Sequence, residues 1–236
     1  MHDTWQAISN APAGRLRVHA LPGFVLGDIV NSGVVYTGAP ENRYSDSAYQ
    51  SFASAYADRK KALYVGANDG MLHAFDADTG NELFAYIPRW LVPQLPSLTS
   101  SSYLHRSYAD GTPAVAEAKV GSDWKTVLVA GTGGGGQGVF ALDVSRPESF
   151  GAGNVMWEFT DRDDPAMGNV IGRPQILKFR RGAPGSAPDY RYYAVVAAGV
   201  NNYVDDGRWS DGSPAIFLLD LSKASNEAWI ENTNYY

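Results

Sequence analysis

Two loops gather oxygen-bearing side chains that suit metal binding. Calcium prefers several carboxylate and carbonyl oxygens on a flexible loop. The first loop has Pro165 and Ala166 where a calcium loop places an oxygen ligand and a turn glycine, whereas the second has its oxygens close to Gly207. A solvated loop without metal is the competing interpretation of both. The metal-ligand candidates are Asn201, Asp205, Asp206 and Asp211 in the second loop, with Asp161 and Asp163 in the first.

Histidine chemistry has little support in the sequence. The histidines are His2, His19, His73 and His105, which lie in different segments without metal-ligand spacing. His73 alternates with apolar neighbours, which predicts a strand residue whose ring bonds a backbone carbonyl. No G-x-S-x-G motif is present, and no Ser, His and Asp can be grouped. We therefore expect no catalytic residue, no cofactor-binding residue and no enzyme.

The glycine-rich run Gly131-Thr-Gly-Gly-Gly-Gly136 matches the G-x-G-x-x-G pattern of dinucleotide-binding sites. Such a site needs a helix after the loop, because the helix N-terminus holds the pyrophosphate. Here the loop is followed by Gly138-Val-Phe-Ala-Leu-Asp143, which is a strand pattern. The run therefore predicts a tight, exposed hairpin loop.

Aromatic residues make up 12% of the chain, and several fall in expected loops. Exposed Trp and Tyr side chains form carbohydrate- or protein-binding surfaces, because they combine a large apolar area with a polar tip. Packing in the core or at its rim is the competing interpretation. The candidates for a binding surface are Trp209, Tyr203, Trp90 and Tyr103.

Composition excludes several classes of protein. The chain has 236 residues, no cysteine and a formal charge of −6. The acidic balance argues against nucleic-acid binding, and the lack of cysteine excludes disulfides and thiolate metal sites. No apolar stretch is long enough for a membrane span, and the first residues lack a signal-peptide pattern.

An internal repeat predicts the fold. Three units each carry four short apolar segments. In each unit the second segment ends in Gly, and the third segment ends in Asp, at Asp76, Asp143 and Asp220. The segments are rich in β-branched and aromatic residues and separated by turn residues, which indicates antiparallel strands. Four-stranded sheets of this kind pack radially into β-propellers. We expect an all-β, propeller-like fold, with three to four four-stranded blades of a larger propeller visible and short helical or loop insertions.

Residues 1–236 are expected to form a single partial propeller domain, with units near 27–88, 111–160 and 172–231. In the third unit, residues 227–230 are expected to be the fourth strand. Each strand-ending Asp is expected to accept backbone N–H bonds in the following turn. Residues 45–58 predict a short helix capped by Ser45 or Asp46, and residues 88–102 an ordered excursion ending in a flexible loop.

The ordered set of motifs resembles the C-terminal propeller of the PilC/PilY family of type IV pilus tip-associated biogenesis proteins and adhesins. The motifs are Gly27-Asp-Ile-Val-Asn-Ser32, Val35-Tyr-Thr-Gly-Ala-Pro40, Tyr64-Val-Gly-Ala-Asn-Asp-Gly-Met-Leu-His-Ala-Phe-Asp76, Ala85-Tyr-Ile-Pro88, Asp110-Gly-Thr-Pro113 and Trp157-Glu-Phe159. The resemblance implies an exported protein at the cell surface, pilus tip or outer membrane, which promotes pilus assembly, twitching motility and adhesion. Implied partners are pilins, the pilus assembly machinery, and a host or abiotic surface.

The resemblance also implies calcium in the family's full-length domain, bound in an Asp-rich loop that this chain does not match. We therefore transfer no calcium ligand to any residue here. Two other propeller classes stay open as alternatives. One is a quinoprotein dehydrogenase with a pyrroloquinoline quinone cofactor, and the other is a scaffold for outer-membrane assembly.

Overall fold

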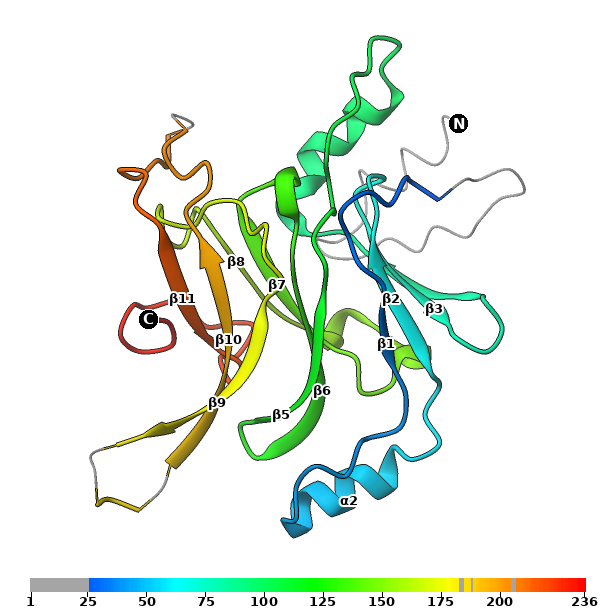
Figure 1. The fold of residues 1–236 in the computed structure, drawn as a ribbon, viewed down its shortest axis with the longest axis vertical. Coiled ribbons are helices and arrows are strands. Elements are labelled where there is room, and N and C mark those ends of the chain that lie inside the picture. The colour runs from blue at the N-terminus through cyan, green and yellow to red at the C-terminus, as the bar shows by residue number, and fades with distance from the viewer. Residues whose placement is uncertain (1–25, 183–184, 188, 205–206) are drawn as a thin grey trace.

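Three antiparallel sheets form the protein (Figure 1). The computed structural model describes residues 26–182, 185–187, 189–204 and 207–236. The first sheet contains β1 (Val35–Thr37), β2 (Ala62–Gly66), β3 (Leu72–Asp76) and β4 (Glu82–Tyr86). The second contains β5 (Ala114–Val120), β6 (Asp123–Gly131), β7 (Gly138–Asp143) and β8 (Val155–Thr160). The third contains β9 (Gln175–Arg181), β10 (Asp189–Ala198) and β11 (Ala215–Asp220). Sequential strands pair in each sheet, which confirms the expected propeller-like class.

The sheets pack face to face, with the second sheet between the other two (Figure 1). Strand β6 shows how its sequence serves two interfaces. Val127 and Val129 lie in the core shared with the third sheet, whereas Leu128 and Ala130 lie in the core shared with the first. Both faces of the strand are apolar, as expected for a strand that is buried on both sides. Burial of each larger side chain contributes about 1.5–3 kcal/mol to the free energy of unfolding.

Glycines at the ends of second strands let neighbouring sheets approach closely. A Cβ atom on Gly66 would lie 2.0 Å from the carbonyl oxygen of Ala109, in the segment that leads into β5. A Cβ atom on Gly131 would lie 2.6 Å from the Cβ of Val170, in the segment that leads into β9. The repeated glycine therefore marks the point where each sheet meets the start of the next one.

The strand-ending aspartates fix the turn after each third strand, as predicted. Their Oδ1 atoms accept backbone N–H bonds from the residue two positions later, at 3.0, 3.0 and 2.7 Å for Asp76, Asp143 and Asp220. Their Oδ2 atoms pair with a cation on the segment or strand alongside, which is Lys60, Lys125 or Arg191 respectively. Each cation stands two residues before the residue paired with the aspartate. The repeat thus includes an ion pair as well as a turn.

The helix α2 (Ser47–Ala55) confirms the helix expected within residues 45–58. Its N-cap is Asp46, whose carboxylate accepts a hydrogen bond from Tyr49 N at 3.0 Å. The buried Tyr49 ring meets Trp124 of β6 edge to face at 4.8 Å, so the helix covers the lower end of the second sheet (Figure 1). A 3-10 helix, Arg89–Thr99, forms the excursion after β4 and buries Leu91 and Leu95.

The expected fourth strand at residues 227–230 is wrong. Residues 234–236 take that place instead, because Leu218 of β11 exchanges backbone hydrogen bonds with Tyr236 at 2.8 and 3.1 Å. Trp229 explains the difference, since its Nε1 donates to Glu158 O at 2.7 Å and its ring packs on Phe159. The segment therefore crosses to the second sheet before it returns to the third.

Candidate functional site

The connecting loops at one end of the sheets form the candidate functional surface (top of Figure 1). Side-chain hydrogen bonds join the loops of successive sheets. Asp110 accepts from Asn31 N and Nδ2 at 2.8 and 2.6 Å, which ties the approach to the first sheet to that of the second. Asn169 Nδ2 donates to Gly133 O at 2.9 Å, which ties the approach to the third sheet to the loop after β6. The loops therefore form one connected platform.

The glycine-rich run is a hairpin loop between β6 and β7, as predicted, but the expectation that it is exposed is wrong. Gly133 and Gly135 are buried. A Cβ atom on Gly135 would lie 1.8 Å from Tyr108 O, and one on Gly136 would lie 3.0 Å from the Trp90 ring. The glycines thus let the backbone pack between two other segments, and no helix N-terminus follows them.

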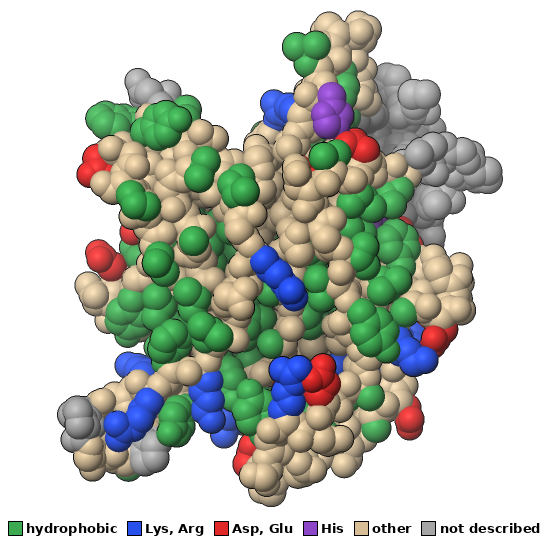
Figure 2. Space-filling view, viewed as in Figure 1, with side chains coloured by type: hydrophobic (Ala, Val, Ile, Leu, Met, Phe, Trp, Pro, Cys, Tyr) green, Lys and Arg blue, Asp and Glu red, His purple; other side chains and the backbone are tan. Residues whose placement is uncertain are grey.

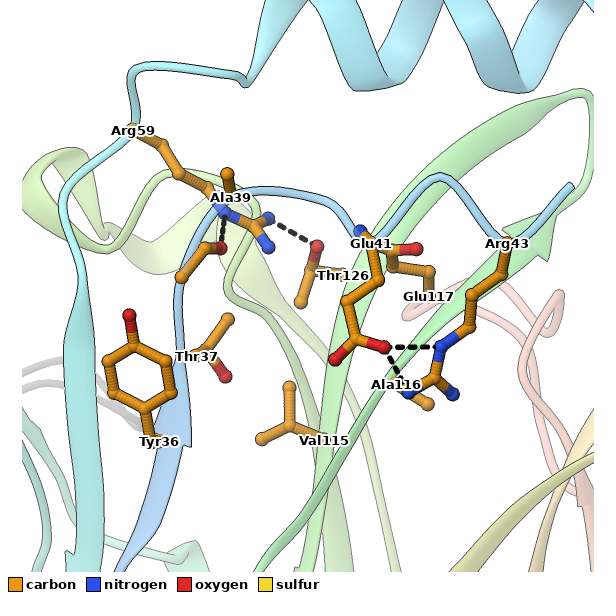
Figure 3. Close-up of a pocket in the computed structure, with 11 residues that line it drawn as sticks. Tyr36, Thr37, Ala39, Glu41, Arg43, Arg59, Val115, Ala116, Glu117 and Thr126 are labelled. Atoms are coloured by element: carbon orange, nitrogen blue, oxygen red, sulfur yellow. Dashed lines mark hydrogen bonds and ion pairs between the residues drawn. The ribbon is translucent and has the colours of Figure 1, made fainter.

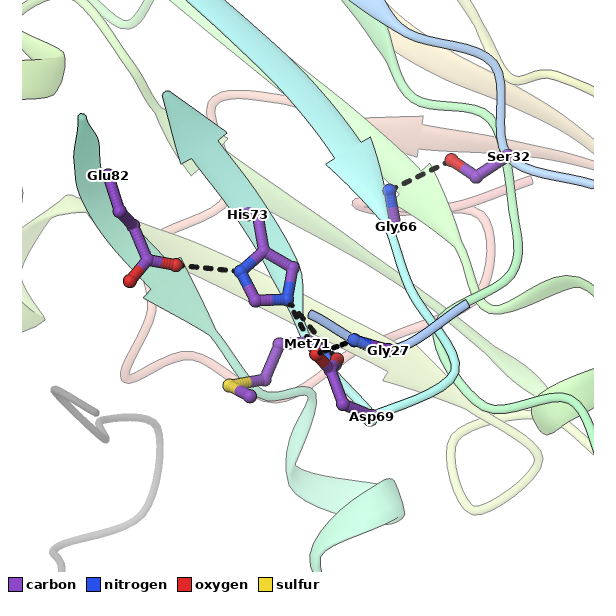
Figure 4. Close-up of polar contacts among 7 residues, drawn as sticks. All are labelled: Gly27, Ser32, Gly66, Asp69, Met71, His73 and Glu82. Atoms are coloured by element: carbon purple, nitrogen blue, oxygen red, sulfur yellow. Dashed lines mark hydrogen bonds and ion pairs between the residues drawn. The ribbon is translucent and has the colours of Figure 1, made fainter. Parts of the chain in front are cut away.

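His73 of β3 lies between two carboxylates, so the predicted bond to a backbone carbonyl is wrong (Figure 4). Its Nδ1 lies 2.7 Å from Glu82 Oε1 and its Nε2 lies 3.0 Å from Asp69 Oδ2. Burial of the ring disfavours its protonated form and lowers the pKa. Hydrogen bonds to Asp69 and Glu82 outweigh this effect and raise the pKa of His73 to about 9. The ring is therefore an imidazolium at neutral pH, which suits an ionic clamp better than a general base.

This clamp also holds the segment that enters the first sheet. Asp69 Oδ2 accepts a hydrogen bond from Gly27 N at 3.0 Å, and Ser32 Oγ accepts one from Gly66 N at 2.8 Å (Figure 4). His73 itself is only 4% exposed. These contacts therefore fix the segment that leads into the first sheet.

Two of the four aromatic candidates are open to solvent. Tyr203 and Trp209, both in the loop between β10 and β11, are 62% and 59% exposed. Trp90 is half-buried, with its Nε1 3.4 Å from Thr132 Oγ1, and Tyr103 is half-buried against the 3-10 helix. A role of these aromatics in binding stays a prediction. Their exposure favours Tyr203 and Trp209 as the contact residues.

Exposed apolar side chains also gather on the outer face of the third sheet (left in Figure 2). Leu177, Phe179 and Ile216 are 44%, 37% and 68% exposed there. Within the described part of the chain, no further sheet covers this face.

The acidic loop candidates occupy turns. Asp163 Oδ2 accepts from Thr160 N at 2.8 Å, and Asp211 Oδ1 accepts from Ser213 N at 2.9 Å. Asn201 donates to Asn169, while Asp161 lies in the turn after β8. Asp205 and Asp206 lie outside the described residues, as do His2 and His19. Among the residues that the structure describes, no three His, Asp or Glu side chains group as metal ligands. The metal interpretation stays a prediction.

Two hollows lie beside the sheets. A groove of about 930 Å³ follows β8 and is lined by Trp90, Trp157 and Trp229 among others. A polar cavity of about 230 Å³ lies between β1 and β5 and includes the buried Arg59 (Figure 3). No sequence pattern singles out Arg59, because it stands in the basic run Arg59-Lys-Lys61, which is typical of a solvated surface.

The chain is similar in sequence to known proteins. A sequence model of the PilY1 beta-propeller domain matches residues 26–230. A type IV pilus biogenesis factor PilY1 homolog of Xylella fastidiosa is 42% identical over 179 residues, which cover 72% of this chain and 14% of that protein. The type IV pilus biogenesis factor PilY1 of Pseudomonas aeruginosa is 38% identical over 219 residues, covering 89% of this chain and 17% of that protein. This chain thus spans a small part of these relatives.

A solved structure is similar as well. The crystal structure of the Pseudomonas aeruginosa PilY1 C-terminal domain aligns with a TM-score of 0.56 and 28% identity, covering 80% of this chain and 35% of that one. No helix within the described ranges is long and apolar enough to cross a membrane. The match to the sequence model, the identity to the two relatives and the shared fold agree, and the chain belongs to the PilY1 beta-propeller domain family.

Proposed function

We propose that this chain is a non-enzymatic propeller module of a type IV pilus biogenesis factor. The observation that carries the proposal is the family match over residues 26–230, together with relatives named as type IV pilus biogenesis factors. The module supports pilus assembly, twitching motility and adhesion to surfaces. It acts outside the cytoplasm, at the cell surface, pilus tip or outer membrane, with pilins and the assembly machinery as partners.

The contact surface for these partners is the loop platform. Binding residues concentrate on loops that a rigid scaffold positions, and here hydrogen bonds join the loops of successive sheets. Tyr203 and Trp209 provide exposed aromatic area on the loop between β10 and β11. The pairing of His73 with Asp69 and Glu82 supports a structural use of the histidine.

Calcium remains an expectation for the family's full-length domain. Asp163 and Asp211 each use one carboxylate oxygen to accept a hydrogen bond from a backbone N–H group in their own turn. We assign no residue of this chain as a calcium ligand.

The first experiment locates the protein relative to pili. Surface pili are sheared from the source cells and the fraction is immunoblotted for this protein, with a strain that cannot assemble pilin as the control. We expect recovery that depends on pilin. Recovery from the periplasm alone, with or without pilin, would contradict the proposal and favour a quinoprotein or scaffold propeller.

A second experiment tests the platform. The double variant Tyr203→Ala/Trp209→Ala is expected to reduce adhesion and twitching at least several-fold while melting at the wild-type temperature. The matched control is Tyr190→Ala, since Tyr190 is 49% exposed on the β9–β10 hairpin at the opposite end. Unchanged adhesion and twitching in the folded double variant would show that these aromatics are not the contact residues.

A further inference from the structure

The cavity between the first and second sheets contains a buried cation. Its wall comes from the segment that follows β1, from β5, and from Arg59 and Thr126 (Figure 3). The cavity reaches solvent, because Tyr36 and Arg43 in its wall are exposed. Arg59 itself is only 7% exposed, which is unusual for an arginine without an ionic partner.

The partners of Arg59 are neutral. Its Nε donates to Gly38 O at 2.6 Å, and its Nη1 donates to Thr126 Oγ1. Within the described residues, Nη2 has no hydrogen-bond acceptor and the guanidinium forms no ion pair. Burial lowers the pKa of Arg59, and the charges of Glu117 and Glu148, which do not contact the guanidinium, offset this effect only in part. A buried charge of this kind favours an anionic partner.

The acidic side chains of the cavity have other partners. Glu117 Oε2 accepts from Tyr49 OH at 2.5 Å, and Glu117 Oε1 accepts from Glu41 N at 3.2 Å. Glu41 pairs with Arg43 at the exposed side of the cavity. These charges oppose an anion at the Glu117 end of the cavity. An anion is attracted most strongly at the Arg59 end of the cavity, between residues 37–39 and Thr126 (Figure 3).

We infer that this cavity binds a carboxylate group through the free edge of the Arg59 guanidinium. The planar guanidinium matches a planar carboxylate and combines charge with directed hydrogen bonds. A volume of about 230 Å³ holds a carboxylate with a short side chain. The carboxylate comes either from a free small acid or from an acidic side chain of a bound protein. This inference does not rest on the proposed pilus function.

The competing interpretation is a cavity that holds only water. Each water takes about 30 Å³ of liquid volume, so several would fill the space. A cavity that holds only water gives no saturable binding of acetate. If a carboxylate binds in the cavity, a bulky residue at the cavity wall weakens that binding. Ala39 lines the cavity and is exposed, so Ala39→Phe obstructs the space while leaving Arg59 in place.

Calorimetric titration of the purified protein tests the inference, with three probes at constant ionic strength. The probes are sodium acetate, a blocked Gly-Glu-Gly peptide with its Gly-Gln-Gly counterpart, and inorganic phosphate. The variants are Arg59→Gln and Ala39→Phe. Matched controls are Arg173→Gln and Ala57→Phe, which change the same residue types at exposed positions outside the cavity wall.

We expect saturable binding of acetate that weakens at least tenfold in Arg59→Gln and Ala39→Phe and stays unchanged in both controls. If the Glu peptide also binds and the Gln peptide does not, the source is a protein side chain; binding of acetate alone indicates a free acid. If Arg59→Gln does not fold, Ala39→Phe decides the result. No saturable heat, undiminished binding in Ala39→Phe, or tighter binding of phosphate than of acetate would overturn the inference.

Discussion

The ionic clamp at His73 predicts a defined loss of stability as the pH rises. Folding raises the pKa of His73 from 6.5 to about 9. A group whose pKa is raised by folding stabilises the protein fully below its unfolded pKa, and this contribution is lost as the pH rises through the folded pKa. The relevant window therefore extends from about pH 6.5 to about pH 9.

The magnitude follows from the pKa difference. One unit corresponds to about 1.4 kcal/mol, so the full shift corresponds to about 3 kcal/mol. The side chains of Asp69 and Glu82 are 20% and 30% exposed, and solvent screening reduces the value to about 2 kcal/mol. We expect His73→Gln to be less stable than wild type by at least this amount at pH 6, and the difference to shrink by about 2 kcal/mol at pH 9.5.

Urea denaturation at pH 6, 7.5 and 9.5 measures this change for wild type and His73→Gln. His105→Gln is the control, since His105 contacts Asp28 at 2.8 Å but both side chains are more than half exposed. That pair contributes roughly 0–1 kcal/mol. An equal stability difference between wild type and His73→Gln at pH 6 and 9.5 would refute the assignment of a charged clamp.

Two further predictions concern packing. Gly135→Ala is expected to cost more than about 3 kcal/mol or to prevent folding, because its Cβ would overlap Tyr108 O, whereas Gly153→Ala meets nothing within 4 Å and serves as the control. Leu128→Ala, fully buried between the first two sheets, is expected to cost about 2–5 kcal/mol, and Leu104→Ala, 83% exposed, under about 0.5 kcal/mol. Chemical denaturation measures both pairs, and equal losses within either pair would contradict the packing described.

Much of the fold could be predicted because the repeated residues form hydrogen bonds with their own neighbours in sequence. An Asp that ends a strand makes its turn through its own side chain, and a Ser or Asp before a helix caps it with its own oxygen. Asp76 and Asp46 behave as their neighbours in sequence dictate. The cation opposite each repeated aspartate, such as Lys60, kept a constant offset and was detectable from the same repeat.

The errors came from contacts between segments distant in sequence. Trp229 draws residues 227–230 towards the second sheet, although their composition favours a strand. Gly135 is buried by Tyr108, which no local pattern indicates. The sequence around Arg59 is typical of an exposed cation, whereas the fold brings β5 and β6 beside this residue. Tertiary context decided each of these positions.

The same contacts separate positions that specify the fold from positions free to change. Gly66 cannot gain a Cβ without moving Ala109, and Asp220 is buried beneath its ion pair with Arg191. In the loop after β10, by contrast, the buried Asn202 donates to Ala166 O at 3.3 Å and to Ser213 O at 2.9 Å. The loop is thereby anchored from within while Tyr203, the next residue, stays exposed. We therefore expect substitutions of exposed residues in this loop to cost little folding stability, which is the property that the proposed contact surface requires.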